Sequence, residues 1–266
     1  MNQAQIEEPF ATFLEFVEEA DRVLQVSIQA ISNISGIGRL AEVLYRSKEI
    51  QDKEDRIKAA KTLEKLAAKE KEDGFPLLIA HSVVGIWAAL EATVPRFLSR
   101  WLSAHPILLS SEKIQRIKLS VSAFSAAGQE EFSLQVIDEL SRSTQSGLKA
   151  GIGRFESLLD CLELGGSVDD KLRRDIYELS KVRNLIVHQF SRVDTKFARD
   201  CPWMQIEIGA RLKLTLQDYA RYRSAICEYG AQLIERSRKS VHSQNIDGNE
   251  SLATKYPTPP RTPPSR

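Results

Sequence analysis

Apolar residues recur at steps of three and four along most of this chain, and that periodicity restricts its fold more than any other feature. Such steps place side chains on one face of an α-helix, so the sequence predicts a mainly all-α protein. The first stripe contains Phe10, Phe13, Leu14, Val17, Leu24, Ile28 and Ile31. Further helices are predicted over residues 40–72, 76–95 with a continuation at 96–102, 111–127, 128–143, 154–164, 167–190 and 218–238.

Two segments depart from the helical pattern. Residues 204–208 and 211–215 alternate apolar and polar side chains around a glycine, which predicts a small β-hairpin. Residues 241–266 are polar and proline-rich, and such a composition is typical of a disordered tail. The domain organisation predicted from these features is one helical domain over residues 1–240, followed by the tail over 241–266.

Composition excludes several classes of protein. The formal net charge is +1, so the chain as a whole has no basic field that would attract nucleic acid, and any such role requires a local patch. Its three cysteines are widely spaced, which indicates neither a disulfide framework nor a zinc site. We find no glycine-rich nucleotide loop, no GxSxG and no HExxH sequence.

The most apolar stretch, residues 77–94, is close to the length of a membrane span. It contains His81 and Glu91, however, and Pro95 follows it, so a buried core helix is the better interpretation. The first residues lack the pattern of a secretory signal. We therefore expect a cytoplasmic protein that has no membrane partner.

A densely charged run occupies residues 46–73, where opposite charges stand one helical turn apart. Pairs of this kind stabilise a helix by only a few tenths of a kcal/mol each, roughly 0.2–0.5. We therefore expect this run to be a solvated helix face rather than a site.

The stretch 180–190, SKVRNLIVHQF, holds an arginine, an asparagine and a histidine within an apolar helical run. Arginine binds phosphate bidentately, histidine exchanges protons near neutral pH, and asparagine is able to orient either one. These residue types suit cleavage of a phosphodiester, and Arg183, Asn184 and His188 are the catalytic candidates. No second metal ligand lies one turn from His188, so we expect neither a metal nor another cofactor.

Helical geometry sets a condition on this site. Asn184 and His188 share one face, whereas Arg183 lies about 140° away from His188 around a straight helix. Either the helix ends near His188 or a second copy of the chain completes the site. A purely structural role for the three residues is the alternative interpretation.

Cations surround this stretch and form a local basic patch that the net charge conceals. Lys181, Arg192 and Lys196 are candidates to bind an RNA backbone. Glu91 needs a partner because it lies in an apolar helix. Arg183 is one candidate, in which case Glu91 supports the site indirectly, and a position facing water is the other.

The segment R-N-L-I-V-H, preceded by ELSKV at the end of a helix, resembles the R-N-x-x-x-H signature of the HEPN superfamily. The resemblance implies a HEPN-like helical bundle over about residues 76–240, with extra N-terminal helices. It also implies a homodimer in which two motif helices face one cleft. The charged run at 46–73 and the hairpin have no obvious counterpart in that family.

Many HEPN domains are metal-independent endoribonucleases of toxin–antitoxin, defence or stress systems. By resemblance, Arg183 would stabilise the scissile phosphate, Asn184 would orient the site and His188 would transfer protons. The 2′-OH of RNA would be the nucleophile, and an antitoxin or other regulatory protein would be a further partner. Non-cleaving members also exist, so an RNA- or protein-binding module is the alternative, and a helical scaffold is a third reading.

Overall fold

The structure, a computed structural model, describes residues 1–46, 52–118, 128–145 and 149–255. These residues are mostly helical, which confirms the prediction of a mainly all-α protein. The helices are α1 Gln3–Ser32, α2 Ile37–Tyr45, α3 Lys53–Asp73, α4 Pro76–Ala104, η1 Pro106–Ser110, α5 Glu112–Gln115, α7 Gln129–Ser143, α8 Gly153–Leu159, η3 Asp160–Leu162, α9 Asp170–Gln189, α10 Thr195–Asp200, η4 Pro202–Met204 and α11 Leu216–Lys255.

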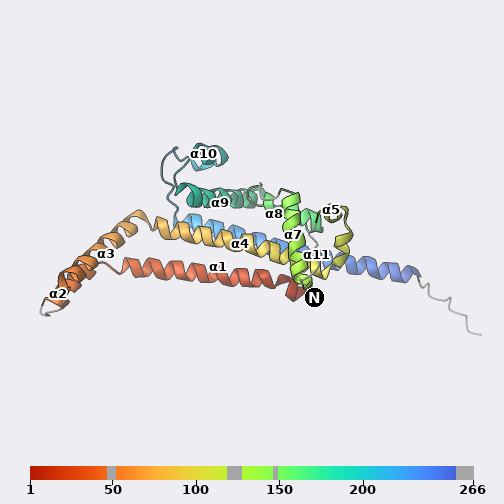
Figure 1. Cartoon of the computed structure of the whole chain (residues 1–266), viewed down its shortest axis with the longest axis horizontal. Coiled ribbons are helices and arrows are strands. Elements are labelled where there is room, and N and C mark those ends of the chain that lie inside the picture. Colours follow the sequence, from red (N-terminus) through yellow and green to blue (C-terminus); the bar gives the residue numbers. More distant parts are fainter. Residues whose placement is uncertain (47–51, 119–127, 146–148, 256–266) are drawn as a thin grey trace, which may run out of the picture.

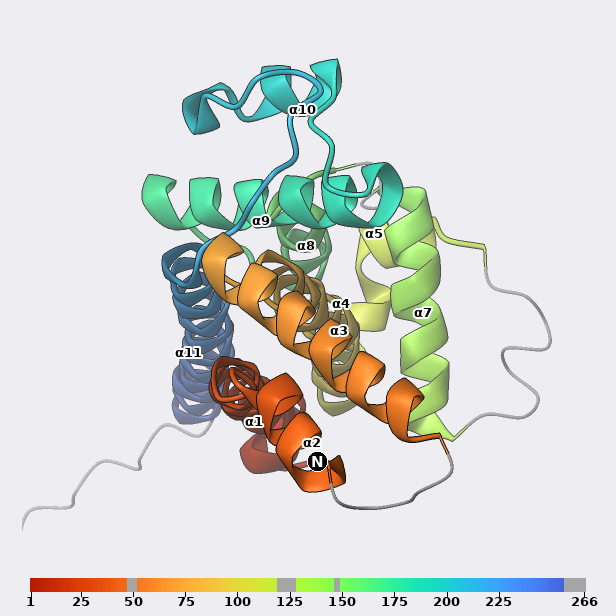
Figure 2. The same cartoon turned by 90° about the vertical axis from the view of Figure 1, so that its left-hand side faces the viewer.

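Helix α4 is the centre of the bundle. It contacts α1, α7, α9 and α11, and Figures 1 and 2 show it enclosed by these helices. Its buried side chains include Ile86, Leu90 and Trp101. Pro95 lies inside the helix, which continues to Ala104, so the helix does not end at this proline. Packing on both sides holds the helix together where proline removes one backbone hydrogen bond.

By length and hydropathy, α4 is the one helix of the described residues that is long and apolar enough to cross a membrane. Core helices meet the same two criteria, and 44% of the most apolar window of α4 is buried inside the protein. The surrounding helices give α4 the packing partners that a core helix requires. A core helix therefore remains our interpretation.

The charged run forms most of an arm made of α2 and α3, which extends from one end of the bundle (Figure 1). The predicted helix over 40–72 is thus two helices, and residues 47–51 between them lie outside the described part. Glu64 of α3 accepts hydrogen bonds from the backbone N–H groups of Gly36 and Gly38, at 2.6 and 3.1 Å. A carboxylate at these orphan N–H groups fixes where α2 begins.

The predicted β-hairpin is wrong. The described residues contain no named strand, and the only bridge recorded among them joins Arg192 to Arg211. Val193 N–H donates to Ala210 O at 2.9 Å and Leu212 N–H donates to Ser191 O at 2.7 Å. The residues just after α9 therefore take the pairing positions that we assigned to 204–208. Positive φ angles at Phe190 and Ser191 turn the chain back and make this possible.

Two helix boundaries differ from the predictions. Helix α9 begins at Asp170 rather than at residue 167, and the side chain of Asp169 caps it by accepting hydrogen bonds from the N–H groups of Lys171 and Leu172. Helix α11 extends to Lys255, past the predicted end near residue 238 and into the predicted tail. Residues 256–266 of that tail lie outside the described residues, as do 119–127 of the helix predicted over 111–127.

Gly151 lies in the turn before α8, where the chain approaches α9 closely. Its φ is +58°, and a Cβ placed there would lie 2.7 Å from the Cα of Tyr177. Its N–H donates to the Ser180 hydroxyl at 3.1 Å. Gly151→Ala should therefore lower the free energy of unfolding by about 2 kcal/mol or more, through backbone strain plus a clash with main chain. Urea denaturation measures this change.

Gly74→Ala is the matched control for that variant. Gly74 also has a positive φ, +78°, but a Cβ there meets no atom within 4 Å. Only the strain remains, so we expect a loss of about 1 kcal/mol. Equal losses in the two variants would show that the approach of Gly151 to α9 is not tight.

Candidate functional site

Helix α9 carries the motif and is fixed to the bundle along one face. Its buried side chains include Leu172, Ile176, Leu179, Val182 and Leu185. The helix ends at Gln189, and Ser191 N–H then donates to Leu185 O at 3.2 Å. His188 consequently lies in the last helical turn, which meets one of the two conditions set by the sequence.

Arg183 reaches toward α4 with part of its hydrogen-bonding capacity unused. Its Nη1 donates to Asn184 Oδ1 at 2.9 Å, and its Nη2 lies 3.7 Å from Glu91 Oε2. The Nε atom is buried and has no hydrogen-bond partner among the described residues. The side chain is 27% exposed. A partly exposed guanidinium with unused donors is able to bind a phosphate.

Glu91 lies between two arginines. Besides its contact with Arg183, it forms a close ion pair with Arg154 of α8. Two environments were considered for Glu91, a pair with Arg183 and a position facing water, and the structure shows the pair with Arg183. Arg154 was not anticipated, because it lies outside the motif and no spacing rule relates it to Glu91 on a separate helix.

His188 and Asn184 line a cavity of about 260 Å³ between α9 and α10. Both side chains are exposed, and His188 makes no hydrogen bond or ion pair within the described part of the chain. Arg183 does not line this cavity. Within one chain, therefore, the arginine and the histidine face different spaces, as their separation around the helix predicts.

The three cations predicted to bind RNA have different surroundings. Lys181 lines the cavity, but its Nζ lies 2.7 Å from Asp200 Oδ2 and it is mostly buried. Burial opposes the charge on Lys181, yet the hydrogen bond to Asp200 and the interactions with Tyr177 together outweigh burial and raise the pKa of the lysine. Lys196 also lines the cavity and is exposed. Arg192 lies on the bridge, where it donates to Gly209 O at 3.3 Å.

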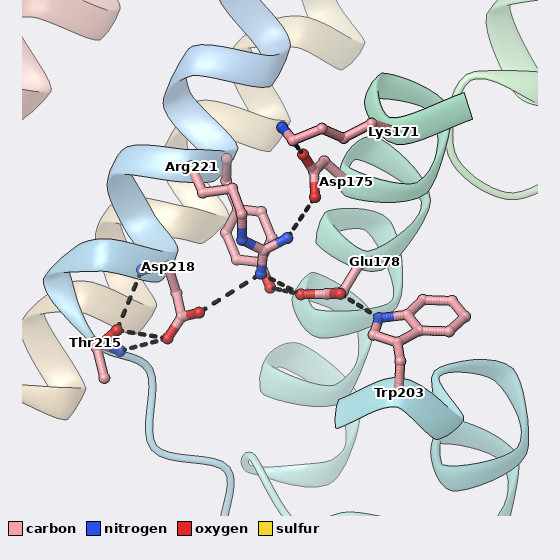
Figure 3. A network of polar contacts seen from close by, with 8 residues as sticks. Lys171, Asp175, Glu178, Trp203, Thr215, Asp218 and Arg221 are labelled. Atoms are coloured by element: carbon pink, nitrogen blue, oxygen red, sulfur yellow. Dashed lines mark hydrogen bonds and ion pairs between the residues drawn. The ribbon is translucent and has the colours of Figure 1, made fainter. Parts of the chain in front are cut away.

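A buried polar network joins α9 to α11 and η4, and Figure 3 shows its members. Glu178, only 2% exposed, accepts hydrogen bonds from Arg221, from the Tyr222 hydroxyl at 2.6 Å and from the Trp203 indole. Arg221 also donates to Asp175 at 2.6 Å. The carboxylate of Glu178 therefore holds together three separate elements.

This network was missing from the sequence-based site. Asp175 and Glu178 stand three residues apart on the same side of α9 as its apolar residues, a position where acids are rare unless they are paired. Arg221 lies between Tyr219 and Tyr222 in the apolar stripe of α11. The presence of charged residues within the apolar stripes of two helices was the sequence signal that could have revealed this network.

The network also fixes the segment that covers the motif helix. Trp203 is held by Glu178 and by Arg174, whose guanidinium carbon lies 4.4 Å from the centre of the indole ring. Lys181 and Asp200 form a second anchor for α10. Figures 1 and 2 show α10 on the outer side of α9, opposite α4. The wall of the His188 cavity thus depends on two anchors.

Metal and thiol chemistry find no support among the described residues. They contain no group of three or more histidine, cysteine or acidic side chains placed to hold a metal ion. Burial raises the pKa of Cys201 to about 12, so its thiol stays protonated at neutral pH. Cys161 and Cys227 are shifted in the same direction by burial.

Comparison with known proteins returned no match: no protein-family model, no curated protein and no solved structure is similar to this chain. A functional assignment consequently depends on the chemistry of the motif helix and of the cavity beside it.

Proposed function

We propose that this chain is a metal-independent endoribonuclease of the HEPN type that acts as a homodimer. The observation that carries the proposal is the state of the two motif side chains. Arg183 is partly exposed and makes one hydrogen bond among the described residues, to Asn184, and His188 is exposed without a partner in the described part of the chain. If the two side chains had only a structural role, we would expect both to be buried and hydrogen-bonded.

The proposed reaction transfers a phosphoryl group within RNA, from a 5′ oxygen to the neighbouring 2′ oxygen. A histidine removes the proton from a 2′-OH, and the 2′ oxygen forms a bond to the adjacent phosphorus. The bond from phosphorus to the 5′ oxygen breaks, and that oxygen takes up a proton. Arg183 stabilises the charge on the phosphate, and Asn184 holds the guanidinium by the hydrogen bond at 2.9 Å. The products end in a 2′,3′-cyclic phosphate and a 5′-OH.

A dimer explains how the arginine and the histidine meet one phosphate. In one chain Arg183 does not line the cavity of His188. Around a two-fold axis, any contact from one copy to the other occurs twice. Pairing two α9 ends would therefore bring the arginine of each copy to the histidine of the other.

A non-catalytic RNA- or protein-binding module is the second candidate. The observation in its favour is Glu91, which lies 3.7 Å from Arg183 and offsets part of its charge. An arginine shared with a carboxylate still binds a phosphate, but it stabilises developing negative charge less well. A regulatory protein that covers the motif is compatible with both candidates.

Incubation of the purified full chain with a defined RNA tests the proposal. We expect fragments with 2′,3′-cyclic phosphate ends, and we expect the same rate in the presence of EDTA because the chemistry uses only side chains. Fragments that carry 3′-OH ends, or activity that chelation abolishes, would instead indicate metal-assisted hydrolysis. RNA binding without any cleavage would favour the non-catalytic module.

A further inference from the structure

We propose that the cavity between α9 and α10 binds one unpaired nucleobase of single-stranded RNA, next to His188. The inference rests on the proposed function for the identity of the ligand as RNA. It goes further in assigning a base-reading role to residues of this cavity, and it is argued from the shape, the rim and the charge of the cavity.

The size of the cavity suits a single nucleotide. Its volume of about 260 Å³ lies just under the range of roughly 300–1,000 Å³ that holds drug-sized ligands. Leu185 and Phe197, which are 3% and 4% exposed, supply apolar surface to its lining. Apolar and aromatic side chains contact the flat faces of unstacked bases in RNA-binding proteins.

The rim carries groups that are suited to the edge of a base. Gln189 is exposed and makes no side-chain hydrogen bond within the described residues, so both halves of its amide are available. Asn184 uses its oxygen for Arg183 and keeps its two N–H donors. Side-chain amides present a donor and an acceptor together, which is the pattern that base edges match. Asp194 adds a carboxylate, one oxygen of which caps α10.

The distribution of charge indicates which part of the cavity would hold a base and which part would hold a phosphate. Lys181 and Asp200 neutralise each other in the lining, and the hydrogen bond from Lys181 lowers the pKa of Asp200. That part of the cavity is thus suited to an uncharged ring. Lys196 is the exposed cation of the lining and has no partner within the described part of the chain. A base in the cavity would leave its phosphate near Lys196 and His188.

Binding of RNA that cannot be cleaved tests this site separately from catalysis. The measurement is the fluorescence anisotropy of 2′-O-methyl homopolymers of A, C and U titrated with the full chain. The 2′-O-methyl group removes the nucleophile and keeps the bases. We expect the tightest and weakest of the three to differ by about tenfold, since an amide that reads a base edge discriminates to this degree.

The double variant Asn184→Ala, Gln189→Ala removes both rim amides and should bring the three affinities within about twofold of one another. Gln25→Ala on α1 is the matched control, because Gln25 is exposed and lies outside the cavity. It should keep the native preference. Far-ultraviolet circular dichroism checks that the variants retain their helices.

The outcomes distinguish this inference from the proposed nuclease. Equal affinities in the native chain, or an unchanged preference in the double variant, would overturn the base site. The nuclease would still stand if unmodified RNA is cut to cyclic phosphate ends. Preference among the homopolymers without cleavage of unmodified RNA would overturn the nuclease and support the base site, and absence of all RNA binding would overturn both.

Discussion

His188→Ala should lower the rate of RNA cleavage by roughly 10²–10⁴, the usual contribution of a general acid or base. Histidine is the side chain most often used for general acid–base catalysis, and His188 is the basic residue of the last turn of α9. Its exposure and lack of partners in the described part of the chain indicate that alanine removes no structural bond. The measurement is the initial rate on a defined RNA, with the urea midpoint as a check on folding.

His81→Ala is the matched control for this variant. His81 is also an exposed histidine on a helix, but it lies on α4 and does not line the cavity. We expect native rates from it. Full activity in the His188 variant, with folding intact, would remove the acid–base assignment and leave the RNA-binding module as the surviving candidate.

Mixed dimers test whether each site takes its arginine and histidine from different copies. Arg183→Ala and His188→Ala chains are each expected to be inactive alone. After the two are unfolded together and refolded, half of the dimers are mixed, and each mixed dimer has one complete site of two. Recovery of about a quarter of native activity is therefore expected from two-fold symmetry. No recovery would place both groups of a site on one chain.

The helices were predictable because periodicity depends on local sequence alone. Residues 76–102 and 128–143 were predicted as helices, and α4 and α7 occupy nearly the same ranges. The hairpin failed for the converse reason, because strand pairing depends on which segment comes near. Ser191 and Val193 occupy the pairing edge of residues 209–212, and no local pattern marks them as the partner.

The candidate site shows the same division between local and distant information. Arg183, Asn184 and His188 were found because they stand on one helix, and their angular relation followed from helix geometry. Arg154 and Arg221 were missed, since each is far in sequence from its carboxylate and neither belongs to the motif that drew attention to Arg183. The cavity itself was also not predicted, because no element was assigned to the residues that form α10.

Glu178→Ala is the substitution from which we expect the largest loss of stability. It would leave Arg221, the Tyr222 hydroxyl and the Trp203 indole without their shared acceptor in the core. Burial alone would lower the pKa of Arg221, but its hydrogen bonds to Glu178 and Asp175 more than offset this and raise it. Arginine stays protonated in proteins, so its charge persists after the substitution. Removing one partner of a buried ion pair costs about 3–5 kcal/mol.

Urea denaturation of Glu178→Ala beside Glu228→Ala measures this effect. Glu228 is also on the α9–α11 side but is exposed, and it forms no hydrogen bond or ion pair with described residues, so its loss should stay within about 0.5 kcal/mol. Glu178→Gln should fall between the two, because an amide still accepts a hydrogen bond but leaves Arg221 with Asp175 as its buried counter-ion. Equal midpoints for all three would mean that water, rather than Glu178, satisfies Arg221.

Since Trp203 anchors the wall of the His188 cavity, a destabilised but folded Glu178 variant should also bind RNA with less base preference than the native chain.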